Sequence, residues 1–428
     1  MDNLRYRLPA RRLNIRKRFA ALTTNERLRA KFFRRVAFVL LAKSRLADNE
    51  DDTNKFKMQS RVCFLRYASI VMETEHFVIE RPLRIHNIDF EMFSRSACWN
   101  YFEFRLEDLT RLLAGLQFPE SCRLENKSRM SGKEVVMRGL YELVSGSPQF
   151  TTCEAVFGRD QSQQSRAFKF FVNHIYENFL FLVTNNLQWW HDNGFFEESN
   201  AAIQSKLEEL NLEFDEVNQC DIGFFLDCNC MESSRVAGGP REDGPDAERW
   251  VDEIQRAFYN GWKSVHGLKH QTVDLAHGYT IDIFGPTSLR RSDLHLLGQS
   301  EINARLAQVQ QGNPKQLKAF GDSIYPNDSH VDSYHKGANL TERQRRENGK
   351  KKRVRVAIEW NYGVTANLFR YLKNIQKLKV MNGGTVAKIY TVATILRNCH
   401  VMLYGGISSS YFDIRIPDDM LERYLRVI

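Results

Sequence analysis

The chain has 428 residues, of which 43% are hydrophobic, so it can form two or three domains and is not disordered throughout. Its longest apolar runs, such as residues 36–42, fall far short of the ~20 residues that span a bilayer, so no membrane-spanning protein is expected. Residues 1–47 carry 14 Lys and Arg against two acidic residues, a charge of +12, which leaves −3 for the rest of a chain whose net charge is +9.

Residues 1–60 are predicted to form a basic N-terminal arm, with a helix over residues 25–46 and an acidic, polar break over residues 48–54. Three roles stay open for such an arm: binding the phosphate backbone of DNA, carrying a nuclear-import signal, or serving as an organellar presequence. The eight cysteines lack paired CxxC spacing and no secretory signal is visible, so we expect reduced thiols in an intracellular protein.

Residues 83–215 are predicted to be an all-α region, because apolar residues recur at helical spacing, as in residues 104–116. Within this region, residues 151–157 and 162–176 indicate two helices joined by a short glycine turn, with Ser162 as the N-cap of the second. The second helix should turn four apolar side chains to the core: Phe168, Phe171, Val172 and Ile175.

The opposite face of that second helix should present polar tips, namely Gln163, Gln164, Arg166 and Lys169. This arrangement is typical of a helix-turn-helix, in which the second helix reads the major groove of DNA. Any helical hairpin of an all-α domain has the same pattern, so DNA reading and simple packing both remain interpretations.

From residue 220 the pattern changes to an α/β order. A buried strand over residues 222–226 is followed by a Gly/Pro-rich loop insertion with six acidic residues, residues 242–253. The pattern after this loop predicts two strands, 262–275 and 279–284, that form a hairpin turning at Gly278, and then a helix over 293–311. A short strand over 316–320 and two helices, 353–376 and 385–403, are predicted to follow. Residues 406–428 are predicted to be a C-terminal tail.

Three carboxylates fall where such a fold can bring side chains together. Asp227 comes directly after the first strand, Asp322 directly after the fourth, and Glu359 within a helix. Clustered hard oxygen ligands favour Mg²⁺ or Mn²⁺ over zinc, and two such ions roughly 4 Å apart support phosphodiester cleavage and strand transfer. Acidic residues are also common at strand ends and on helix surfaces, so a chance arrangement is the competing interpretation.

Further polar residues near these acids have two interpretations each. Asp293 is either a fourth metal ligand or, with Ser292, a helix N-cap. The basic run Lys350, Lys351, Lys352 and Arg353, placed just before the helix of Glu359, is a solvated loop, an import signal or a surface that meets DNA. His266, His270, His277 and His295 lack metal-ligand spacing and are predicted to be ordinary core or surface histidines.

These motifs, taken in order, resemble the endonuclease domain of PIF/Harbinger transposases over residues 220–405. The resemblance rests on the strand ending in Asp227, on Gly285-Pro286 followed by Ser292-Asp293, and on a linked pair of motifs. In that pair, Gly321-Asp322-Ser323-Ile324-Tyr325-Pro326 is followed by Arg355-Val-Ala-Ile-Glu359, so that Glu359 comes 37 positions after Asp322. Residues 84–180 also look like the helical, helix-turn-helix region that precedes the nuclease in this family.

The resemblance implies an RNase H-like mixed sheet flanked by helices, preceded by an all-α helix-turn-helix region. It implies a nuclear DNA endonuclease or transposase with Asp227, Asp322 and Glu359 as catalytic metal ligands and Asp293 as the auxiliary acid. DNA is the expected partner; a separate Myb-like protein assists DNA binding in this family, and a homo-oligomer stays open.

Two positions depart from the family pattern. The first Asp is usually followed by Gly-Thr-His, whereas Asp227 is followed by Cys228-Asn229-Cys230. The residue before the auxiliary Asp is often His, and here it is Ser292. These departures fit a divergent branch, or the alternative function of a host-domesticated, non-catalytic DNA-binding protein derived from a transposase.

Overall fold

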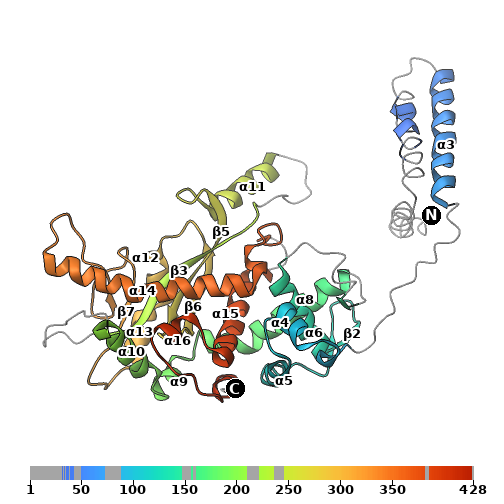
Figure 1. Cartoon of the computed structure of the whole chain (residues 1–428). Coiled ribbons are helices and arrows are strands. Elements are labelled where there is room, and N and C mark those ends of the chain that lie inside the picture. The colour runs from blue at the N-terminus through green and yellow to red at the C-terminus, as the bar shows by residue number, and fades with distance from the viewer. Residues whose placement is uncertain are drawn as a thin grey trace. The chain divides into compact units, whose positions relative to one another are not determined.

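The structure is a computed structural model that describes part of residues 31–42 and the segments 50–72, 88–146, 156–157, 161–209, 221–235, 245–380 and 385–426 (Figure 1). Its contacts divide the chain into two compact units, Met1–Leu83 and Arg84–Ile428. Most of the predicted basic arm lies outside the described residues.

In the first unit, the described residues between 31 and 42 are helical and a second helix, α3, spans Glu50–Met72. The Ser60 hydroxyl of α3 donates a hydrogen bond of 2.8 Å to the carbonyl of Ala37, which ties the two helical segments together. The prediction of a polar break over residues 48–54 is wrong from Glu50 onward. Acidic side chains are favoured in the first turn of a helix, because they face the positive end of its dipole.

The second unit begins with helices that surround a small hairpin. Their bounds are η1 Phe90–Met92, α4 Arg95–Phe102, α5 Leu106–Gly115, β1 Ser121–Arg123, β2 Arg129–Ser131, α6 Gly132–Ser145, α8 Gln161–Phe179, η2 Leu180–Val183, α9 Leu187–Asp192 and α10 Phe195–Glu209. Ser94 and Ser131 cap α4 and α6 by accepting the backbone N–H groups of Ala97 and Glu134. The antiparallel pair β1–β2 corrects the prediction that this region is entirely helical.

A mixed sheet and its flanking helices complete the unit and confirm the predicted α/β class. The remaining elements are β3 Ile222–Glu232, α11 Pro245–Phe258, β4 Tyr259–Asn260, β5 Val265–Asp274, β6 Thr280–Ser288, α12 Asp293–Ser300, α13 Ile302–Val309, β7 Lys318–Phe320, β8 Val331–Asp332, α14 Glu342–Leu368, η3 Arg370–Lys373, α15 Thr385–Tyr404, α16 Ile407–Tyr411 and α17 Met420–Leu425. The strands lie in the order β6-β5-β3-β7-β8, with β4 pairing the start of β5. Neighbours β6, β5 and β3 are antiparallel, and β7 and β8 run parallel to β3.

Three predicted boundaries were wrong. Strand β3 continues to Glu232, so Asp227 lies within the strand, because its second half pairs fully with β5. The supposed acidic loop contains helix α11, which carries Asp252 and Glu253. Helix α14 starts at Glu342 rather than near 353, so the run Lys350–Arg353 is helical.

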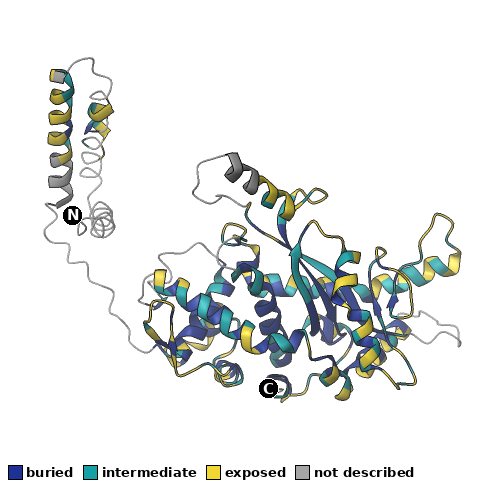
Figure 2. Cartoon of the chain, turned by 180° about the vertical axis from the view of Figure 1, so that it is seen from behind, coloured by how far each residue is buried: buried dark blue, intermediate teal, exposed yellow. Residues whose placement is uncertain are grey.

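One apolar core joins the helices to the sheet. Buried residues of α6 and α8 belong to the same cluster as those of β5, β6 and α15, and α15 packs against α8 and β6 (Figure 2). Residues 406–428, expected to be a tail, include α16 and α17; α17 packs against α5 and α15, with Met420, Leu421 and Tyr424 buried.

Candidate active site

The parallel pairing of β3 and β7 brings the first two predicted acids to the same level of the sheet. Phe225 of β3 is opposite Phe320 of β7, and Asp227 and Asp322 each follow two positions later. Side chains two residues apart along a strand point to the same face. The placement of Asp322 beyond the last residue of β7 agrees with the sequence prediction.

Asp227 is a largely buried carboxylate with two charged or polar partners. Its side chain is 16% exposed; Oδ1 accepts the backbone N–H of Cys228 at 2.8 Å, and Oδ2 accepts Nη2 of Arg355 at 2.7 Å. Burial raises the pKa of Asp227 to about 6, with Arg355 opposing the shift and the charges of Asp293 and Asp322 adding to it. Asp227 is therefore close enough to Asp293 and Asp322 to be affected by their charges.

Glu359 is linked to Asp227 by Arg355, which binds both carboxylates. The guanidinium donates its Nη1 hydrogen bond to Oε1 of Glu359 at 2.8 Å while Nη2 binds Asp227. The Glu359 side chain is 57% exposed, so its other oxygen is accessible from solvent. Arg355 thus links two of the predicted catalytic acids.

Helix α14 is held against the sheet by polar contacts next to Glu359. The Asn361 amide donates to the buried carboxylate of Asp274 at 2.8 Å, and the hydroxyls of Tyr362 and Thr272 lie 2.8 Å apart. Thr272 is the β5 residue opposite Asp227. These contacts fix the position along the helix from which Glu359 projects.

Arg355 is a candidate functional residue that the sequence interpretation included only as part of a motif. Burial lowers the pKa of its guanidinium, but Asp227, Glu359 and Asp322 outweigh burial and hold the pKa above its ordinary value. A signal was present in the sequence, because Arg and Glu four positions apart lie side by side on a helix. Its Nε has no hydrogen-bond partner among the described residues.

Asp293 opens α12 and is bound by a buried lysine. Lys269 Nζ donates to Asp293 Oδ1 and to the carbonyl of Arg291, both at 2.7 Å. The N-cap itself is Ser292, whose hydroxyl accepts the backbone N–H of His295. Lys269 therefore holds Asp293 beside Cys228 and Asp227, whose pKa values the Asp293 charge raises.

The donor set fits a hard divalent cation in kind. The proposed ligands offer carboxylate oxygens, which Mg²⁺ and Mn²⁺ prefer: Asp227, Asp293, Asp322 and Glu359. The negative charges of Asp227 and Glu359 are already balanced in part by Arg355. In the described part of the chain, no three His, Cys, Asp or Glu side chains lie close enough together to hold a metal ion. The assignment of these acids as metal ligands stays a prediction.

The predicted DNA-contact residues of α8 divide into two sets. Gln164, expected to face outward, is buried; its amide accepts from Arg138 and donates to the Arg138 carbonyl, each at 3.0 Å. That prediction is wrong, because the buried Arg138 needs polar partners. Gln163 and Arg166 are half-buried, and the half-buried Lys169 forms an ion pair with Glu125. Phe168, Phe171, Val172 and Ile175 face the core, as predicted.

Two further details concern that helical pair. Helix α8 begins at Gln161, so Ser162 lies inside its first turn rather than at the predicted N-cap. Residues 156–157 are helical, and the rest of the predicted first helix and turn falls outside the described residues.

In the basic run of α14, Lys351 is engaged within the chain. Its Nζ lies 2.6 Å from Asp332 and 3.1 Å from the carbonyl of Ser333. Lys352 and Arg353 are exposed, and Lys350 is half-buried. The exposed pair is the part of this run best placed to meet a polyanion.

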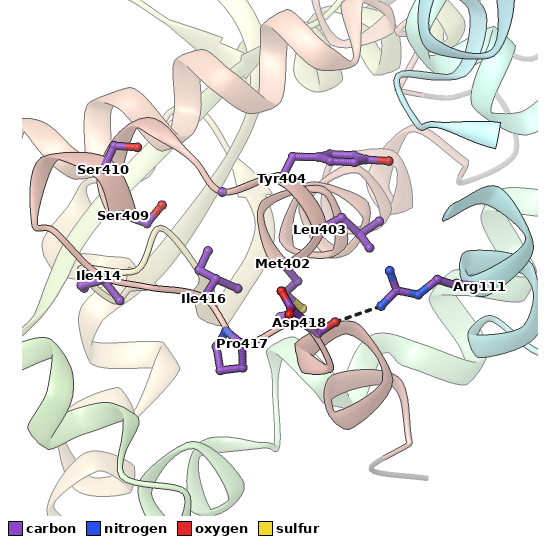
Figure 3. A pocket seen from close by; sticks show the side chains of 11 residues that line it. Arg111, Met402, Leu403, Tyr404, Ser409, Ser410, Ile414, Ile416, Pro417 and Asp418 are labelled. Carbon is purple, nitrogen blue, oxygen red and sulfur yellow. Dashed lines mark hydrogen bonds between the residues drawn. The ribbon is translucent and has the colours of Figure 1, made fainter. Parts of the chain in front are cut away.

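A separate cavity of about 460 Å³ lies between the end of α15, the segment that follows it and Arg111 of α5 (Figure 3). Arg111 donates to the carbonyl of Asp418 at 3.0 Å and pairs with Glu422. Asp227, Asp293, Asp322 and Glu359 do not line this cavity, so it is not part of the acidic site.

Comparison with known proteins supports a nuclease assignment for this part of the fold. The model of a family described as DDE superfamily endonuclease matches residues 246–398. The matched range contains Asp293, Asp322, Arg355 and Glu359, and strand β3 with Asp227 precedes it. No curated protein and no solved structure matches the chain significantly.

Among the described residues, no helix is both long and apolar enough to cross a membrane.

The family match covers strands β4–β8 and helices α12–α14, which carry Asp293 and Glu359, together with α15 up to residue 398. Over residues 246–398, the chain is similar to DDE superfamily endonucleases, a family of transposase-derived nucleases.

Proposed function

We propose that this protein is a divalent-metal-dependent DNA endonuclease or transposase of the PIF/Harbinger type. The observation that carries the proposal is the sharing of Arg355 by Asp227 and Glu359, with Asp322 and Asp293 acting on the Asp227 charge. Two acids, from β3 and α14, thus share one cation, and the charges of the other two act on Asp227. Such a cluster repels itself unless a cation is present.

The proposed metal ligands are Asp227, Asp322 and Glu359, with Asp293 as an auxiliary acid, and the proposed cation is Mg²⁺ or Mn²⁺. The chemistry that this cation supplies when bound is activation of a water or 3′-hydroxyl and stabilisation of the departing oxygen. The chain's own part is to orient the carboxylates: β3 and β7 fix the two aspartates, and Asn361 and Tyr362 fix the helix of Glu359.

The strand order supports an RNase H-like fold. Three antiparallel strands, β6, β5 and β3, are extended by two short parallel ones, β7 and β8, with β3 in the centre. The first acid then lies on the central strand and the second follows its parallel neighbour. This arrangement is the one expected for the endonuclease domain that the sequence motifs resemble.

DNA is the proposed substrate. We infer that Gln163, Arg166, Lys350, Lys352 and Arg353 contact it, together with the basic residues before 47, and that the protein acts in the nucleus. A Myb-like partner and a homo-oligomer belong to the same proposal. The helix-turn-helix assignment is supported by the exposed start of α8.

One observation favours the alternative of a non-catalytic, domesticated DNA-binding protein. Arg355 neutralises Asp227 and Glu359 without a metal, and the described residues hold no preassembled group of three metal donors. The two functions differ in whether a divalent cation displaces Arg355 from these carboxylates.

Replacing Arg355 by glutamine is expected to raise the affinity of the metal-free protein for Mn²⁺ by about tenfold. The guanidinium competes for the same oxygens, and a hydrogen bond to a charged group contributes roughly 1.5–3 kcal/mol. Isothermal titration of Mn²⁺ into the metal-free full chain measures this affinity. Arg353→Gln, an exposed position on the same helix, is the matched control and should leave the affinity unchanged.

The same titration tests the proposed ligands. Glu359→Gln should weaken Mn²⁺ binding strongly, because it removes one charged ligand and leaves the rest of α14 unchanged. Undetectable Mn²⁺ binding by the wild type and by Arg355→Gln would instead favour the non-catalytic DNA-binding protein.

A further inference from the structure

The most exposed large apolar side chain in the described part of the chain is a tryptophan at the tip of a hairpin. Trp262 is 95% exposed and lies in the loop 261–264 that joins β4 to β5. Its neighbour Tyr259 is 39% exposed, with its ring centroid 5.1 Å from that of His266. Figure 1 shows this end of β5, together with α11, projecting from the body of the sheet.

The tip has a defined conformation although Trp262 makes little contact. The Asn260 side chain accepts the backbone N–H of Lys263 and donates to the carbonyl of Leu289, both at 2.9 Å. Ser264 has a φ of 57°, a left-handed conformation that costs free energy for a residue with a Cβ. The chain therefore maintains a constrained turn that presents an indole ring to solvent.

Cationic side chains lie on this loop and on the segments joined to it. Arg256 at the end of α11, Lys263 beside the tryptophan, and Arg290 and Arg291 of the loop after β6 are all exposed. These four cations form no ion pair with the described residues. Exposed acids are also near: Asp252 and Glu253 on the preceding turn of α11, and Glu232 at the end of β3.

The loop after β6, which carries Arg290 and Arg291, connects the tip to the candidate active site. Asn260 binds the Leu289 carbonyl, Leu289 donates to Gly267 of β5, and the carbonyl of Arg291 accepts from the Lys269 that holds Asp293. Strand β5 itself runs from the tip to Thr272, opposite Asp227. The seven steps along the strand from Val265 to Thr272 span about 23 Å at ~3.3 Å per residue.

We propose that Trp262 is a stacking platform for an unpaired DNA base, with Arg290 and Arg291 binding the neighbouring phosphates. This inference rests on the proposed function for the identity of the polymer. Aromatic faces bind bases of any sequence, and cations alongside attract the backbone.

DNA fits this surface better than a protein does. A protein partner needs a contiguous apolar patch, whereas the loop around Trp262 consists of Gly261, Lys263 and Ser264. The exposed indole and the arginines on the adjoining loop instead match a polyanion whose bases offer flat faces.

The test uses the full chain in the presence of a chelator, so that binding is measured without cleavage. The probes are a short DNA duplex with single-stranded thymine overhangs and the blunt duplex of the same sequence. Wild-type tryptophan emission should be quenched by the overhang duplex, and Trp262→Phe should remove that component, while Trp99→Phe on α4 keeps it. Trp262→Ala should bind the overhang duplex about tenfold more weakly and the blunt duplex almost unchanged.

Equal quenching in Trp262→Phe, equal affinity in Trp262→Ala, or no binding of either probe by the wild type overturns the stacking proposal. Unchanged thermal unfolding of the variants shows that they are folded, which the exposure of Trp262 predicts. A loss of overhang affinity in a protein that never cleaves DNA would keep this inference and refute the nuclease. Cleavage by the wild type, together with unchanged affinity of Trp262→Ala for the overhang duplex, would keep the nuclease and refute the stacking role of Trp262.

Discussion

Asp322→Asn is expected to abolish metal-dependent DNA cleavage while leaving the fold and DNA affinity intact. Asparagine keeps the size of aspartate and can still accept the Ile324 N–H that Oδ1 accepts now, but it lacks the charge that binds a cation. Loss of one charged ligand of a two-metal site should cost several kcal/mol of transition-state stabilisation, or several orders of magnitude in rate. Single-turnover cleavage with Mg²⁺ or Mn²⁺ measures the effect.

The same loop offers a matched control. Asp328 also accepts two backbone N–H groups, those of His330 and Val331 at 2.8 Å, but it is not one of the proposed ligands. Asp328→Asn should therefore cleave at nearly the wild-type rate. Asp293→Asn should be milder than Asp322→Asn if its carboxylate is auxiliary. An Asp322→Asn protein that still cleaves would remove Asp322 from the catalytic set.

Glu134→Ala is expected to lower the free energy of unfolding by roughly 3–5 kcal/mol, because it removes one partner of a buried, charged hydrogen bond. Arg138 is fully buried and its Nε lies 2.9 Å from Oε1 of Glu134, itself 1% exposed. Gln164 and the Phe157 carbonyl also accept hydrogen bonds from the guanidinium, and both are uncharged.

Urea denaturation of the two proteins measures this difference. Glu177→Ala on α8 is the control, because Glu177 pairs with Lys388 but is 65% exposed, and exposed pairs contribute little. If Glu134→Ala and Glu177→Ala unfold at the same urea concentration, the buried ion pair is not a main determinant of this core.

The pairing of strands followed from the sequence more reliably than their ends. The hairpin of β5 and β6 around Gly278 was predicted, since alternating apolar runs flank a residue that readily adopts its φ of 90°. The extension of β3 past Asp227 was not, because Cys228-Asn229-Cys230 is polar and half-buried, and only the pairing with β5 makes it a strand.

The start of α14 could have been found. Thr341 and Gln344 form a capping box, whose Thr-x-x-Gln spacing is visible in the sequence, whereas the helix was predicted to begin only at residue 353. The burial of Gln164 was beyond helical periodicity, since its partner Arg138 lies on another helix. For the candidate site, the motif gave the acids and included Arg355, but the guanidinium's contact with Asp227 depends on the packing of α14 against β3.

The central claim is that these carboxylates hold a divalent cation and cut DNA. Its most direct test is to incubate the wild-type chain with DNA carrying the terminal sequences of its own element, a Myb-like DNA-binding partner, and Mg²⁺, Mn²⁺ or a chelator. We predict strand cleavage at the ends with either metal and none with the chelator. DNA binding without cleavage under any metal condition would contradict the nuclease and identify the protein as a non-catalytic DNA binder.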